Sequence, residues 1–111
     1  MTIKQFKDLL SSGQIKFEDT MQVIEDNFEF SPTKFKNGKT INEEGQNSGS
    51  CKLFALAKEI GLSEEDTLKA FGQYYKEVLD TPEGESHQNI RNFMKFGWSG
   101  ISFEKTALSL K

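Results

Sequence analysis

One turn constrains the fold of this chain more than any other feature of its sequence. The pair Asn37-Gly38 is the one preferred in two-residue type I′ hairpin turns, and it separates two short segments of alternating polar and apolar residues. We therefore expect a β-hairpin over residues 33–42. Residues 98–103 also have the pattern of an extended segment, so a strand near 100–104 is expected to pair with the hairpin and complete a small antiparallel sheet.

Outside the hairpin, apolar residues recur at the three- and four-residue spacing of amphipathic helices. Thr2 and Gly13 are suited to cap the two ends of a first helix. Ser63 precedes three acidic residues, which is the usual composition of a helix start. The predicted helices cover residues 3–12, about 17–28, from near 50 to 60, from 63 to near 80, and from near 87 to 97.

The predicted fold class is α+β, with four to five short helices packed on one face of the small antiparallel sheet. A length of 111 residues is enough for a single domain over residues 1–111 with one core and no disulfides. Ten phenylalanines supply the large apolar side chains that such a core needs. The residues expected to contribute to the core are Phe54, Phe71, Phe93 and Trp98.

Charge and composition disfavour several classes of partner. The net charge is −3, with 14 basic and 17 acidic residues spread along the chain, so no strong field attracts nucleic acid or anionic lipid. No apolar run is long enough to insert into a membrane, and the N-terminus lacks the apolar segment of a signal peptide. A single cysteine forms no internal disulfide, which fits synthesis and residence in the cytoplasm. We expect no metal site and no cofactor, since one His and one Cys are too few ligands for zinc.

Cys51 is the residue with the clearest potential for chemistry. It follows the glycine- and serine-rich loop 45–50 and stands where an apolar helix is predicted to begin. Unpaired amides and the positive end of the helix dipole favour a thiolate at such a position. The structural alternative is an inert buried thiol, which is common for free cysteines.

His87 is the only histidine and so the only imidazole that could pair with Cys51. Asn92 or Asn89 could orient its ring, and Gln46 could help to stabilise an oxyanion. These residues define a hypothetical catalytic set of Cys51, His87 and Asn92. In the structural alternative, His87 begins a helix and its ring bonds backbone groups or Glu85.

Several segments, in order and over nearly the whole chain, resemble the HopJ type III effector family. The resemblance implies a small bacterial protein related to effectors that a type III secretion system delivers into host cells. It implies no catalytic residues, because none is established for the family. The matching segments are Phe17-Glu18-Asp19-Thr20-Met21, Phe30-Ser31-Pro32-Thr33, Asn42-Glu43, residues 45–55, Phe71-Gly72-Gln73-Tyr74-Tyr75, and residues 87–95.

Three functional hypotheses follow. In the first, the chain is a monomeric binding module whose 42–51 loop and 81–92 segment engage a host or bacterial protein. In the second, Cys51 and His87 form a small thiol-dependent hydrolase or transferase. In the third, the chain is a bacterial cytoplasmic housekeeping protein with no effector role. The candidate binding residues are Gln46, Asn47, Ser48, Ser50, Asn89 and Arg91.

Overall fold

Six α-helices and five short strands form a single α+β domain, as the sequence predicts for the class. The computed structural model describes all residues 1–111. The helices are α1 (Ile3–Ser12), α2 (Phe17–Asn27), α3 (Ser48–Ile60), α4 (Glu64–Lys69), α5 (Gln73–Asp80) and α6 (Gln88–Phe96). The strands are β1 (Phe28–Phe30), β2 (Phe35–Asn37), β3 (Thr40–Asn42), β4 (Ile101–Phe103) and β5 (Leu108–Leu110).

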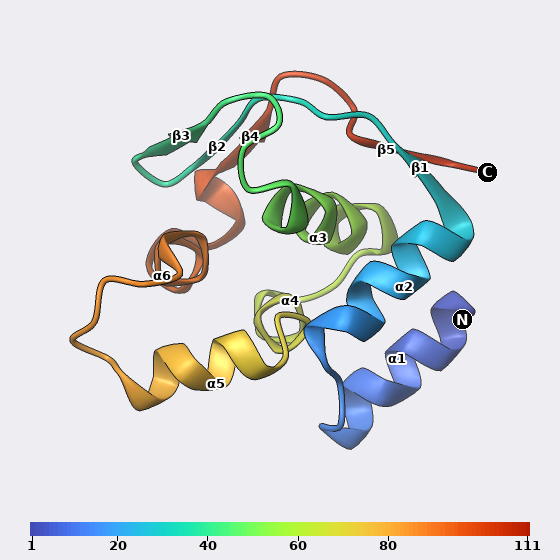
Figure 1. Ribbon diagram of the computed structural model, residues 1–111, viewed down its shortest axis with the longest axis horizontal. Helices are drawn as coiled ribbons and strands as arrows, with labels where there is room; N and C mark the ends of the chain where they lie inside the picture. The colour runs from blue at the N-terminus through green and yellow to red at the C-terminus, as the bar shows by residue number, and fades with distance from the viewer.

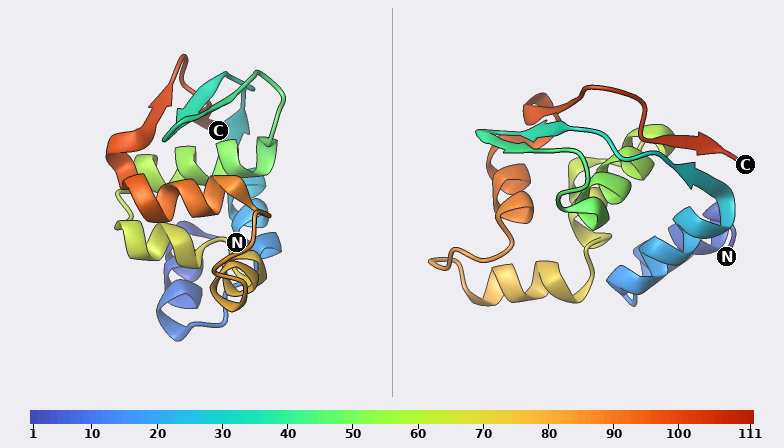
Figure 2. Two further views of the ribbon diagram at one scale, coloured as in Figure 1. Left: turned by 90° about the vertical axis from the view of Figure 1, so that its left-hand side faces the viewer. Right: turned by 45° about the horizontal axis from the view of Figure 1, so that its top comes forward.

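The predicted hairpin and its third strand are confirmed. Strands β2 and β3 pair antiparallel, and β4 pairs antiparallel with the other edge of β2, giving the order β3-β2-β4. A second antiparallel pair, β1 with β5, was not predicted; Phe28 lies opposite Leu110. Both sheets lie on one side of α3, and the remaining helices lie beside or below it (Figures 1 and 2).

The hairpin turn is shifted by one residue from its predicted position. Because Asn37 pairs with Thr40 in the ladder, the two loop residues are Gly38 and Lys39. Gly38 has a φ of 62° whereas Lys39 is not in the left-handed region, which is the pattern of a type II′ turn and not of type I′. Asn37 is instead a strand residue with its side chain in the interior.

The helix predicted from 63 to near 80 is two helices, so the count of four to five was too low. Gly72 separates α4 from α5 with a φ of 59°. A Cβ at this position would lie 2.5 Å from the backbone nitrogen of Phe17, so only glycine permits the close approach. Residues 98–103 also differ from the prediction, because 97–100 form a 3₁₀ helix and the strand is confined to 101–103.

Phe54 is the centre of the core. Its side chain is fully buried on α3, and its ring lies 5.0 Å from Phe93 and 5.5 Å from Phe71, centroid to centroid. Trp98 is half-buried and meets the same ring at 6.5 Å, while Phe35 contacts it from the sheet at 6.3 Å. All four residues predicted for the core therefore take part in it.

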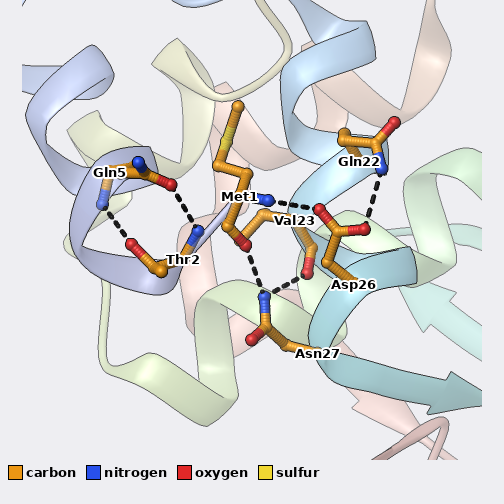
Figure 3. A network of polar contacts seen from close by, with 7 residues as sticks. All are labelled: Met1, Thr2, Gln5, Gln22, Val23, Asp26 and Asn27. Carbon is orange, nitrogen blue, oxygen red and sulfur yellow. Dashed lines mark hydrogen bonds and ion pairs between the residues drawn. The ribbon is translucent and has the colours of Figure 1, made fainter.

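The N-terminus is held against α2 by a network of polar contacts (Figure 3). The ammonium group of Met1 forms an ion pair with Asp26, and Asn27 Nδ2 donates to the carbonyls of Met1 at 2.9 Å and Val23 at 2.8 Å. The ammonium and Gln22 hold the pKa of Asp26 below its ordinary value. These contacts fix α1 against α2 in the fold.

None of the helices has the length and apolar character needed to span a membrane.

Candidate functional site

A pocket of about 400 Å³ lies where the starts of α3 and α6 come together. Its size is within the range of pockets that hold small ligands or single side chains, roughly 300–1,000 Å³. Three aromatic rings and several hydrogen-bonding groups share the lining. The residues that line it are Phe17, Thr40, Asn47, Gly49, Ser50, Phe71, Tyr74, His87, Gln88, Asn89 and Ile90.

The two helices begin in the same unusual way at this pocket. Asn47 precedes α3 with a φ of 50° and His87 precedes α6 with a φ of 53°, and these are the two non-glycine residues with positive φ. Neither side chain caps its helix. The amides of residues 48–50 and of residues 88–89 donate no hydrogen bond within the protein, so they are free donors.

Four asparagines form a network behind the pocket. Asn89 Nδ2 donates to Asn42 Oδ1 at 3.1 Å, and Asn47 Nδ2 donates to the same oxygen at 2.7 Å. Asn37 Nδ2 donates to both the carbonyl and Oδ1 of Asn89, at 2.8 and 3.0 Å. Asn37, Asn42 and Asn89 are buried, so the network joins β2, β3 and the two helix starts inside the protein.

The roles of Asn37 and Asn42 were not predicted from the sequence. Asn37 was assigned to the turn, and Asn42 was not singled out as a site residue. Strand alternation carries the relevant information, because Asn37 is two residues after the buried Phe35 and so faces the same side. Asn37 Oδ1 has no hydrogen-bond partner, an uncommon state for a buried oxygen.

Cys51 lies in the first turns of α3 but does not line the pocket. It is 2% exposed, and its thiol donates a weak hydrogen bond to the carbonyl of Thr33 at 3.9 Å. Burial raises the pKa of Cys51, and a smaller contribution from the backbone of Thr33 opposes this effect only in part. The surroundings therefore favour the protonated thiol over the thiolate expected from the position in the helix.

His87 contacts Glu77 and Tyr74. Its Nε2 lies 2.7 Å from Glu77 Oε2, and its ring centroid lies 5.3 Å from that of Tyr74. An ionised carboxylate only accepts hydrogen bonds, so this contact places a proton on Nε2. The partner of the imidazole is Glu77 of α5, and no hydrogen bond joins His87 to Cys51. The catalytic pair stays a prediction.

Asn92 lies between α6 and the hairpin. Its Nδ2 donates to Thr40 Oγ1 at 2.8 Å, which links the helix to β3. Arg91, in contrast, organises the loop after α5, since its guanidinium donates to the Thr81 carbonyl at 2.9 Å and the Ser86 carbonyl at 2.5 Å. Both residues have structural contacts that account for their side-chain orientation.

The remaining candidate residues belong to the loop before α3. Gln46 Oε1 accepts from the amide of Glu43 at 3.0 Å, and Ser48 Oγ donates to the carbonyl of Gly45 at 3.3 Å. These bonds stabilise the loop. Of the candidate binding residues, Asn47, Ser50 and Asn89 line the pocket. No three potential ligands among His, Cys, Asp and Glu are grouped so as to hold a metal ion.

The structure defines a small α+β domain with one pocket between two helix starts, and comparison with known proteins gives its family. The chain belongs to the HopJ type III effector protein family, whose pattern it matches over residues 3–108. It is similar to a solved structure described as the crystal structure of unknown function protein VPA0580, with 51% sequence identity and a TM-score of 0.96. That match covers 100% of this chain and 95% of the other. The comparison with curated proteins finds no match.

Proposed function

We propose that this chain is an effector-like, protein-binding module whose recognition site is the pocket between the starts of α3 and α6. The observation that carries the proposal is that residues from both segments singled out in the sequence, 42–51 and 81–92, line one pocket. Loops placed on a rigid scaffold are the usual location of binding residues. Membership of the HopJ family supports the effector-like character.

The lining suggests what kind of group the pocket accepts. Phe17, Phe71 and Tyr74 provide an apolar wall suited to a large side chain of a partner protein. The free amides at the two helix starts and the hydroxyl of Ser50 provide donors for carbonyl groups beside that side chain. A partner segment with an exposed apolar residue in a loop satisfies both requirements.

A site-specific photocrosslinker at Gln88 provides the test. Gln88 is exposed at the edge of the pocket, so a crosslinker there captures a bound partner, which mass spectrometry identifies. The affinity of that partner, once purified, is then measured for wild type, Ser50→Trp and the control Ser102→Trp. Ser50→Trp fills the pocket, whereas Ser102 is exposed on β4.

We expect Ser50→Trp to weaken binding at least about tenfold and Ser102→Trp to leave it unchanged. Equal affinity of the partner for both variants would contradict the proposed site. A crosslinked product that forms equally well from a crosslinker at Ser102 would contradict it too. Delivery into host cells is part of the proposal, and a translocated reporter fused to the chain tests it; cytoplasmic retention would favour the housekeeping alternative.

The thiol-dependent enzyme stays a second hypothesis without a supporting observation. It requires an accessible thiolate at Cys51, whereas the side chain is buried and its pKa is raised. It also requires an imidazole next to the sulfur, whereas His87 bonds Glu77. The binding hypothesis needs no such rearrangement, so it accounts better for the geometry.

A further inference from the structure

A second concave surface, the α5–α6 groove, shares no lining residue with the pocket between α3 and α6. It has a volume of about 330 Å³ and is lined by the end of α5, the loop after it and one side of α6. Leu79 and Met94 are 52% and 44% exposed, and they are two of only four large apolar side chains exposed in the protein. Pro82 adds a third apolar surface. Exposed apolar side chains that gather in one concave site are typical of interaction surfaces.

The charge of the groove is opposite to that of the whole chain. Arg91 and Lys95 line it, no acidic residue does, and the chain carries a net charge of −3. The guanidinium of Arg91 donates only to neutral oxygens: the carbonyls of Thr81, Pro82 and Ser86, and the hydroxyl of Thr81. Neither Arg91 nor Lys95 forms an ion pair. Neither of the two positive charges in the groove is therefore paired with a carboxylate.

We propose that the α5–α6 groove docks a segment of a partner protein that presents a large apolar side chain next to a carboxylate. The apolar side chain packs on Leu79, Met94 and Pro82. The carboxylate pairs with Lys95, and the positive charge of the Arg91 guanidinium, which hydrogen bonds hold against the 81–86 loop, adds to the attraction. Charge complementarity thus selects an acidic and apolar segment.

An anionic membrane is the other surface with this chemistry, but the groove suits it less well. Each basic residue near an anionic bilayer contributes only about 1 kcal/mol, and two cations on a negatively charged protein give weak attraction. The apolar residues line a concavity, whereas a bilayer is contacted by side chains that project from a convex surface or helix face.

The test begins with selection from a library of random short peptides against the full chain at low salt. The enriched peptides are synthesised with a fluorophore, and fluorescence anisotropy gives their affinities for four proteins. These are wild type, Leu79→Ser/Met94→Ser, Lys95→Glu and the control Lys36→Glu/Ile41→Ser. The control alters the exposed face of the hairpin, where Ile41 is 55% exposed. It combines the two kinds of substitution made in the groove, Lys to Glu and an apolar residue to Ser.

We expect the selected peptides to combine an acidic residue with Leu, Met or an aromatic residue. The two groove variants should each bind about tenfold more weakly, and the control should bind as wild type does. Added salt should weaken binding to wild type, and this dependence should be smaller for Lys95→Glu. Because Lys95 is exposed, its substitution tests the groove even where the double variant is destabilised.

Three results would overturn the proposal. One is a selection that yields no binder or no enrichment of acidic residues. Another is an affinity that the groove variants leave unchanged or that the control reduces equally. In the third, the wild-type chain binds phosphatidylglycerol vesicles, the groove variants do not, and no peptide binds. That result would assign the groove to a membrane. None of these results depends on how Ser50→Trp changes the affinity of a partner for the pocket between α3 and α6. The proposed function is therefore tested separately.

Discussion

Replacement of Asn89 by alanine tests the buried asparagine network most directly. The substitution removes three side-chain hydrogen bonds, two accepted by Asn89 Oδ1 and one donated by its Nδ2. Asn37 Nδ2 keeps the carbonyl of residue 89, and Asn42 Oδ1 keeps Asn47 Nδ2. Asn42 Nδ2 loses its one partner and becomes a buried donor without an acceptor.

The expected loss follows from these changes. A buried donor left without a partner costs about 1–3 kcal/mol, and each further lost hydrogen bond costs about 0.5–1.5 kcal/mol. Alanine recovers a few tenths of a kcal/mol through its better helix propensity. We therefore expect Asn89→Ala to lower the free energy of unfolding by about 2–4 kcal/mol.

Urea unfolding followed by the fluorescence of Trp98 and by circular dichroism measures this loss. Asn92→Ala is the matched control, because it removes one partly buried bond to Thr40 that water can replace. Its expected cost is about 0.5–1.5 kcal/mol. In Asn42→Ala/Asn89→Ala no donor is orphaned at residue 42, so the double variant should lose less than the two single variants together, by about 1 kcal/mol. Additive losses, or a loss below about 1 kcal/mol for Asn89→Ala, would contradict this role of the asparagine network.

Three further predictions concern the core, the thiol and the N-terminus. Phe54→Ala should lower the free energy of unfolding by about 3–5 kcal/mol in the same assay, since the ring is fully buried; a loss below about 1 kcal/mol would contradict this. Iodoacetamide should modify Cys51 far more slowly in the native protein than in urea, because burial raises its pKa, and mass spectrometry measures the rates. Fast native alkylation that His87→Ala slows would instead support the thiol enzyme. The lowered pKa of Asp26 contributes stability that is present above its unfolded pKa of about 4 and is lost as the pH falls through its folded pKa. Melting curves at decreasing pH should therefore converge for wild type and Asp26→Asn, and a constant difference would exclude the ion pair as its cause.

The ends of the helices could be predicted where the capping groups are local. Helix α1 spans the predicted residues 3–12, because Thr2 and Gln5 form a capping box and Gly13 takes a left-handed conformation. Ser63 caps α4 as predicted. In these cases all the interacting groups are within a few residues of one another, so the sequence contains the whole interaction.

The candidate site shows where local patterns stop being sufficient. The sequence predicted binding residues in the segments 42–51 and 81–92, which stays a prediction, and the structure shows that both segments contribute to one pocket. It did not identify the aromatic wall, because Phe17 and Phe71 reach the pocket from helices whose packing no local pattern specifies. The α5–α6 groove was likewise not predicted, since the sequence did not show that the predicted helix 63–80 divides into α4 and α5.

The α+β class, the hairpin with its third strand, the caps of α1 and α4, and the family could all be inferred from the amino-acid sequence alone. The family follows from the matching segments, whereas the class, the hairpin and the caps depend on period and on turn and capping residues, which act over short distances along the chain. The break at Gly72, the burial of Cys51 and the inward position of Asn37 became evident from the tertiary structure alone. Each depends on a residue far away in the sequence: Phe17 against Gly72, Thr33 beside the thiol, and Asn89 bonded to Asn37. Packing between distant segments overrides local preference at these positions, because a steric clash or an unpaired buried polar group costs more free energy than a local propensity contributes.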